Sequence, residues 1–170
     1  MWHVSCLRGG AGIDAFVLSI FAWALLGFGN VYYALAQRAL DKTIAAAKKK
    51  SSLALSRSMA YHPEIQHTIA EMVIELESIG PHLDRIAEDW SKGLDYGAEW
   101  PLQIFAAEYR AVAEWSMQAS ILPEVRAFFV RQDTRDARLG RIHPANAFLT
   151  HEVVGKTALR ISLDEQPRWG

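Results

Sequence analysis

The sequence predicts an all-α fold in which four helices pack as an antiparallel, up-and-down bundle. Three observations support this prediction. Apolar residues recur at steps of three and four in long segments, which places them on one helical face. No segment shows the sustained apolar–polar alternation of a half-buried strand. With 170 residues, of which 51% are hydrophobic, the chain can bury one sizeable core.

The first predicted helix is the longest. It begins as early as Ala15 and continues to Lys50, because Ala, Leu, Gln, Arg and Lys dominate the sequence after Asn30. The pair Ser51-Ser52 then loosens or ends it.

The first part of this helix has a second interpretation, because Ala15 to Gln37 contains no charged residue. The segment is long enough to cross a bilayer, and Lys48-Lys49-Lys50 lies downstream where a cytoplasmic flank would be. We favour a helix buried in the bundle core. Gly27, Gly29 and Asn30 interrupt the apolar run, and the later helices need an apolar partner.

The second predicted helix begins at His62-Pro63-Glu64, with proline at the first helical position and an acid in the first turn. Pro81 falls inside the helix and is expected to kink or split it after Gly80. The apolar face consists of Ile65, Ile69, Met72, Leu76, Ile79, Leu83 and Ile86.

Two more helices complete the predicted bundle. A connection at Ser91 to Gly97 leads to a third helix, which starts near Pro101 and ends at Pro123. The last helix extends roughly from Ala147 to Leu163, with Asn146 as its N-cap. The apolar face of the third helix contains Leu102, Phe105, Tyr109 and Val112.

Charge and cysteine content exclude several classes of function. A formal net charge of -1 gives no field that would attract nucleic acid or an anionic membrane. Cys6 is the only cysteine, which excludes an internal disulfide and a cysteine-rich zinc site and suits the cytoplasm. Glu64 and His67 have the Glu-x-x-His spacing of di-iron bundles, but no second such motif follows, so no metal site is expected.

Four stretches, in this order along the chain, resemble one known family. They are 33–41 (YALAQRALD), 62–72 (HPEIQHTIAEM), 135–156 (RDARLGRIHPANAFLTHEVVGK) and 166–170 (QPRWG). Together they resemble the C-terminal helical domain of the acyl-CoA dehydrogenases, flavoenzymes that desaturate acyl-CoA thioesters at the α,β-carbons. Family members carry two further domains ahead of this one, so the resemblance implies a truncated chain.

The resemblance implies FAD as cofactor, bound at a subunit interface, and a carboxylate that removes the substrate α-proton. In most members this base is a glutamate in the C-terminal tail or on the first helix. Pro144 stands at the first location and Ala24 at the second. Neither side chain accepts a proton, and no catalytic residue is therefore expected.

The resemblance also places four residues at the cofactor. They are Lys50 at the end of the first helix, Ser52 just beyond it, Gln118 toward the end of the third helix and Asn146 ahead of the last. Lys50 stands where the family usually has an arginine, and lysine keeps the charge but lacks the bidentate fork. A basic helix end, stabilised by the helix dipole, explains Lys48-Lys49-Lys50 equally well.

The expected organisation is an irregular remnant of a preceding domain at 1–14, the helical bundle at 15–165 and a polar tail at 166–170. The family chemistry would be FAD-dependent desaturation of acyl-CoA, absent from the isolated chain because two domains are missing. The expected partners are acyl-CoA and either further copies of this chain or a full-length dehydrogenase subunit. A bundle without its neighbours also leaves apolar faces uncovered, so self-association is expected.

Two alternatives remain open at this stage. One is a non-catalytic assembly subunit of a heteromeric acyl-CoA dehydrogenase, which the missing carboxylates at Pro144 and Ala24 favour. The other is a small helical protein anchored in a membrane by Ala15 to Gln37, although a membrane is the less expected partner.

Overall fold

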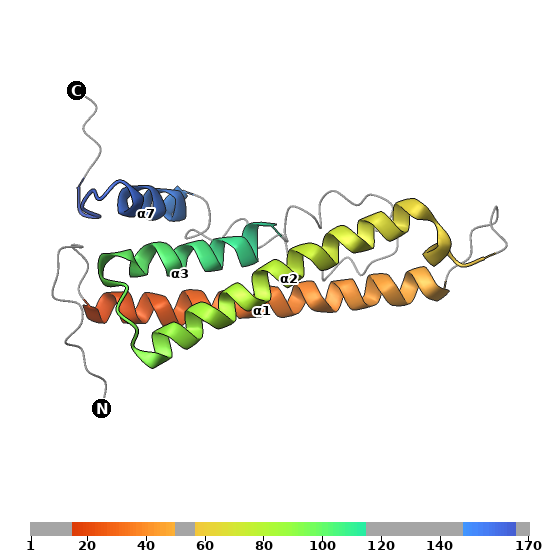
Figure 1. Ribbon diagram of the computed structural model, residues 1–170, viewed down its shortest axis with the longest axis horizontal. Helices are drawn as coiled ribbons and strands as arrows, with labels where there is room; N and C mark the ends of the chain where they lie inside the picture. Colours follow the sequence, from red (N-terminus) through yellow and green to blue (C-terminus); the bar gives the residue numbers. More distant parts are fainter. Residues whose placement is uncertain (1–14, 50–56, 115–147, 166–170) are drawn as a thin grey trace, which may run out of the picture.

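The computed structural model describes residues 15–49, 57–114 and 148–165 (Figure 1). The described residues form four α-helices: α1 (Ala15–Lys49), α2 (Pro63–Lys92), α3 (Trp100–Tyr109) and α7 (Phe148–Ala158). Short turns of 3-10 helix, η2 (Met59–Tyr61) and η3 (Gly97–Glu99), precede α2 and α3, and a π-helical turn, η4 (Arg110–Glu114), follows α3. These three ranges contain no β-strand element. The predicted all-α class is confirmed.

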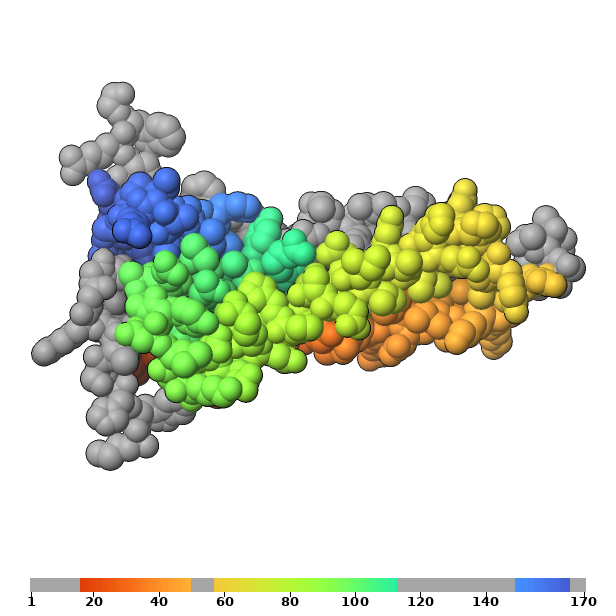
Figure 2. All heavy atoms as spheres, in the orientation of Figure 1, coloured from red at the N-terminus to blue at the C-terminus, as the bar shows by residue number. Residues whose placement is uncertain are grey.

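The helices alternate in direction. In Figure 1, α1 and α3 run one way along the long axis of the molecule, and α2 and α7 run the other way. α1 contacts both α2 and α3, and α7 packs on α3. The molecule is therefore an up-and-down bundle. The C-terminal end of α1 and the N-terminal end of α2 extend beyond α3 and α7 as a two-helix arm (Figures 1 and 2).

Local sequence signals set the ends of α2. Pro63 occupies the first turn, where its missing N–H would have had no intrahelical partner, and Glu64 lies at the positive end of the helix dipole. Gly93 ends the helix in the left-handed conformation, at φ 68°, and its N–H donates to the carbonyls of Asp89 and Trp90. Glycine adopts this conformation without the steric cost of a Cβ atom.

α2 is not split at Pro81. The helix is continuous from Pro63 to Lys92, with Pro81 exposed and Gly80 buried inside it. Proline removes one backbone donor, but packing on both sides of this point holds the helix together. Tyr33 of α1 lies against Gly80, and Ile79 and Leu83 are buried in the core on either side.

Most of the core lies where α1, α2 and α3 meet, with Val153 of α7 added from the outside. Five of the seven predicted apolar positions of α2 are buried, and the first two, Ile65 and Ile69, are half-buried. A smaller cluster, Ala36, Met72 and Leu76, joins α1 to α2 in the two-helix arm. The members of the main cluster are Leu18, Ala22, Leu25, Leu26, Ile79, Leu83, Ile86, Trp100, Ile104, Phe105, Ala107, Ala111 and Val153.

The charge-free part of α1 is buried on one face only, which differs from the predicted core helix. Leu18, Ala22 and Leu25 face the bundle, whereas Ile20 and Trp23 are exposed. Within the described residues, Phe16–Lys49 is one helix long and apolar enough to cross a membrane, and 28% of its most apolar window is buried. Core helices of water-soluble proteins and signal sequences also meet this criterion.

The predicted domain boundaries remain predictions. Residues 1–14 and 166–170 lie outside the described ranges. Within 15–165, the described residues form one set of packed helices.

Candidate functional site

The four residues that the resemblance places at the cofactor, Lys50, Ser52, Gln118 and Asn146, lie outside the described residues. The same holds for Pro144, which stands at one of the two locations of the family's base. The structure therefore neither brings these residues together nor separates them.

Ala24, at the other location of the base, is described and lies on the exposed side of α1. A methyl group at this point offers no proton acceptor. Lys48 and Lys49, the described neighbours of Lys50, are exposed in the last turn of α1. That end of a helix is negative, so the two lysines are stabilised there by the helix dipole. A phosphate would meet lysine side chains at this end and not the backbone N–H groups of a helix N-terminus.

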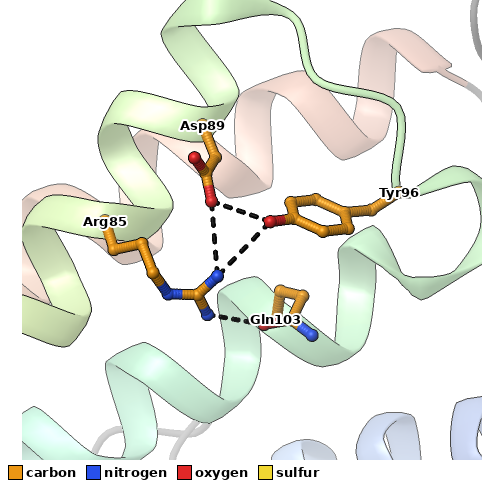
Figure 3. A network of polar contacts seen from close by, with 4 residues as sticks. All are labelled: Arg85, Asp89, Tyr96 and Gln103. Carbon is orange, nitrogen blue, oxygen red and sulfur yellow. Dashed lines mark hydrogen bonds and ion pairs between the residues drawn. The ribbon is translucent and has the colours of Figure 1, made fainter.

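A polar network joins α2 to the beginning of α3 (Figure 3). The Tyr96 hydroxyl donates to Oδ2 of Asp89 at 2.8 Å. Arg85 Nη1 lies 3.3 Å from the same Asp89 oxygen and 3.3 Å from Tyr96 Oη, and its Nη2 donates to Gln103 Oε1 at 3.3 Å. The hydrogen bond to the Asp89 carboxylate raises the pKa of Tyr96 above its ordinary value of 10.0, with smaller contributions from burial and from the Asp89 charge.

An aromatic cluster supports this network. The ring of the buried Trp100 meets Trp90 edge-on at 4.8 Å and Tyr96 edge-on at 4.9 Å between centroids. The cluster and the polar network together fix the α2–α3 connection. Each of the four polar side chains in Figure 3 bonds to another of them. The arrangement is thus structural. Periodicity alone did not reveal it, although the four-residue spacing of Arg85 and Asp89 is a signal for an ion pair.

Glu108 of α3 is the most unusual ionisable group in the described part of the bundle. Glu108 is 1% exposed, and its buried Oε2 atom accepts no hydrogen bond. Burial raises the pKa of this carboxyl from 4.5 to about 7. Its backbone lies beside Gly29, where a Cβ atom would be 3.7 Å from Glu108 Cα. The π-helical turn η4 begins two residues later.

A second polar cluster lies on α2 near the end of α3. Arg110 Nη2 is 3.5 Å from Glu75 Oε2 and 3.5 Å from Ser78 Oγ. Burial lowers the pKa of the nearby His82 below 6.5, and the charges of Arg85 and Arg110 lower it further. His82 is therefore mainly neutral at physiological pH.

Metal ligation finds no support among the described residues, which contain no group of three or more His, Cys, Asp or Glu side chains placed to hold an ion. Glu64 and His67 are both exposed on α2. His151 of α7 packs edge-on against Tyr109 of α3, with 5.0 Å between ring centroids.

Comparison with known proteins identifies the fold. No family model and no curated protein sequence matches the chain. The structure is similar to a probable acyl-CoA dehydrogenase from Mycobacterium abscessus, with a TM-score of 0.61 and 23% identity. It is also similar to butyryl-CoA dehydrogenase from Megasphaera elsdenii, with a TM-score of 0.60 and 16% identity. The bundle has an acyl-CoA dehydrogenase fold.

The acyl-CoA dehydrogenase fold is present here in part. Each comparison covers 84% of this chain and 38% of the solved chain. The chain thus spans well under half the length of the proteins it resembles, as expected for one helical domain. The predicted resemblance is confirmed for the fold.

Proposed function

We propose that this chain is the C-terminal helical domain of an acyl-CoA dehydrogenase-like flavoprotein and that it forms one wall of an FAD and acyl-CoA site. The observation that supports this most strongly is the agreement between the sequence motifs and the fold. The order of the sequence motifs points to this domain, and the structure is similar to acyl-CoA dehydrogenases over 84% of the chain.

The described residues do not by themselves make a cofactor site. Ala24 provides no carboxylate, and Lys48 and Lys49 are solvent-exposed at the negative end of α1. Glu108 is a carboxyl group, but it is buried inside the bundle and not directed to a surface. The wall must be completed by Lys50, Ser52, Gln118 and Asn146 and by protein outside this bundle. When bound, FAD would supply the redox chemistry.

The first experiment is to isolate the chain from its own cells and record its visible absorption and its acyl-CoA oxidation with an added electron acceptor. The chain alone should not oxidise acyl-CoA. A complex with the missing domains, from a longer form of this chain or from a dehydrogenase subunit, should show flavin absorbance. Activity of the pure chain would contradict the need for those domains.

Two variants of the complex test the cofactor wall. Lys50→Ala and Gln118→Ala should each lower the flavin content per chain, because both remove a polar group expected at the cofactor. Lys92→Ala, on the exposed end of α2, is the matched control and should leave the flavin content unchanged. Equal flavin content in all three variants would exclude these positions from the site.

A second candidate is a non-catalytic assembly subunit, which the exposed Ala24 favours because the described helices offer no base at that location. Restoring a carboxylate distinguishes the two functions. In a flavin-containing complex, Ala24→Glu should raise the rate of α-proton exchange from acyl-CoA if the domain adjoins a substrate. The rate should stay at the background level if the chain serves in assembly only.

A further inference from the structure

Three helical segments of the bundle each carry a point of weakness. In α2, Pro81 has no backbone N–H, so one intrahelical hydrogen bond is missing. In α1, Gly29 interrupts the helix with a residue of low helix propensity. At the end of α3, the helix passes into the π-helical turn η4 (Arg110–Glu114). Proline, glycine and π-helical turns are all points at which helices bend.

Close contacts place these three points at one level of the bundle. A Cβ atom on Gly29 would lie 2.9 Å from Leu83 Cδ2 on α2 and 3.7 Å from Ala111 Cβ on η4. Leu83 follows Pro81 by two residues, less than one helical turn. We call the level of Gly29, Pro81 and Ala111 the hinge level.

The core is divided near the hinge level. On one side, α1, α2, α3 and α7 share the main apolar cluster, and we call this part the bundle body. On the other side lies the two-helix arm, where the described residues bury only the small cluster of Ala36, Met72 and Leu76 (Figure 1). Tyr33 packs against both clusters. A part of the fold with fewer buried apolar contacts has the lower local stability.

Two contacts connect the arm to the body at this level. One is the packing of Tyr33 on Gly80. The other joins η4 to the arm part of α2, where Arg110 Nη2 lies 3.5 Å from Glu75 Oε2. The pair is long and partly exposed, and this Glu75 oxygen accepts no hydrogen bond. Such a contact adds little stability and can open at small cost.

We propose that the two-helix arm bends relative to the bundle body at the hinge level, and that the ion pair between Arg110 and Glu75 is the latch that opens when it bends. Bending needs little new disruption, because α2 already lacks a hydrogen bond there. The motion carries the exposed Lys48 and Lys49, at the end of the arm, relative to the body. This inference uses the fold alone and does not depend on the flavoprotein function.

Distances between spin labels on the full chain test the bending. In a Cys6→Ser background, Ala70→Cys labels the arm and Leu149→Cys labels the body, and both positions are exposed. This pair should give a wide distance distribution or two populations. The exposed Asp84→Cys with Leu149→Cys, both in the body, is the control pair and should give one narrow distribution. Equal widths for the two pairs would overturn the proposal.

Two substitutions together should stiffen the hinge. Pro81→Ala restores a backbone donor at an exposed position. Gly27→Ala raises helix propensity next to Gly29, and its Cβ atom meets nothing within 4 Å. The double variant should narrow the arm-to-body distribution toward the width of the control pair. Gly155→Ala fills an equally open position in α7 and should leave the distribution wide. A double variant as wide as the wild type would exclude bending at this level.

Hydrogen exchange tests the latch. Glu75→Gln weakens the contact with Arg110 and should speed exchange of the arm amides by up to about fivefold, the equivalent of one exposed ion pair. Glu77→Gln, at an exposed position of α2, is the matched control and should leave the exchange rates unchanged. Equal rates in the two variants would overturn the role of the latch. Circular dichroism accompanies each variant, because a wide distribution with lost helix would show local unfolding and contradict a hinge.

Discussion

The phenol of Tyr33 occupies the space that a side chain at Gly80 would need. A Cβ atom on Gly80 would lie 2.5 Å from Tyr33 Oη and 2.8 Å from Tyr33 Cζ, far inside contact distance. Gly80 immediately precedes Pro81, so the close approach of α1 and α2 falls at the point where α2 lacks one backbone hydrogen bond. This packing compensates for the proline in the middle of the helix.

Gly80→Ala should therefore destabilise the protein, by about 1–3 kcal/mol from overpacking, partly offset by the better helix propensity of alanine. Urea denaturation measures the change. Gly155→Ala in α7 is the matched control, since a Cβ atom there meets nothing within 4 Å, and it should be neutral or stabilising. If both substitutions stabilise equally, Tyr33 does not require the glycine.

The sequence predicted the helices well where local signals are strong. The start of α2 at Pro63 follows from proline and the acid of the first turn, and the buried stripe from Met72 to Ile86 follows from its periodicity. The same reasoning predicted that Pro81 would kink or split the helix after Gly80. The helix is not split, because tertiary packing against Tyr33 outweighs one lost hydrogen bond.

Other features were beyond local reasoning. A charge-free segment has no amphipathic pattern, so the one-sided burial of α1 could not be deduced from its apolar residues. The contact of Tyr96 with Asp89 depends on how the α2–α3 connection folds back.

Glu108 is different, because it lies three residues after Phe105 on the predicted apolar face of the third helix. That spacing was a signal for a buried acid.

The buried Glu108 should make stability depend on pH. Its pKa is about 7 in the folded state and 4.5 ordinarily, so the unfolded chain loses this proton first as the pH rises. The contribution of Glu108 to the free energy of unfolding is complete below pH 4.5. As the pH rises from 4.5 to 7 this contribution is lost, and the loss amounts to at most about 3 kcal/mol. His82, whose pKa is lowered, acts in the opposite sense by destabilising the fold below pH 6.5.

Comparing variants isolates the contribution of Glu108. The stability of the wild type minus that of Glu108→Gln should fall as the pH rises from 4.5 to 7, because glutamine does not titrate. Chemical denaturation at several pH values measures this difference. Glu99→Gln, at an exposed residue of η3, is the control and should show no such fall. If the difference in stability between the wild type and Glu108→Gln is the same at every pH, the Glu108 carboxyl has the same pKa in the folded and the unfolded chain.

The phenol of Tyr96 should titrate above its ordinary pKa of 10.0, because its proton is held by the Asp89 carboxylate. Asp89→Asn removes the negative charge and should lower the pKa of Tyr96 toward 10.0. Nuclear magnetic resonance of the labelled tyrosine ring follows this titration. Gln103→Leu removes a contact to Arg85 only and should leave the Tyr96 titration almost unchanged. Equal shifts in the two variants would contradict the role of Asp89.

Lys156 should hold the end of α7 in place. Its Nζ lies 2.6 Å from Glu152 Oε1 and donates to the carbonyls of Leu163 and Glu165 at 3.2 and 2.7 Å. Lys156→Met keeps the apolar stem but removes these bonds, and should cost about 1–2 kcal/mol. Hydrogen exchange should report the loss at the Ile161 amide, which donates to the Lys156 carbonyl.

The pair formed by Lys92 and Glu88 on α2 provides the control. It has the same spacing and the same 2.6 Å separation, but both side chains are largely exposed and Lys92 lies at the helix end. Lys92→Met should therefore change stability little, because solvent screens an exposed ion pair. If Lys156→Met and Lys92→Met behave alike, the two carbonyl contacts of Lys156 do not stabilise the end of α7.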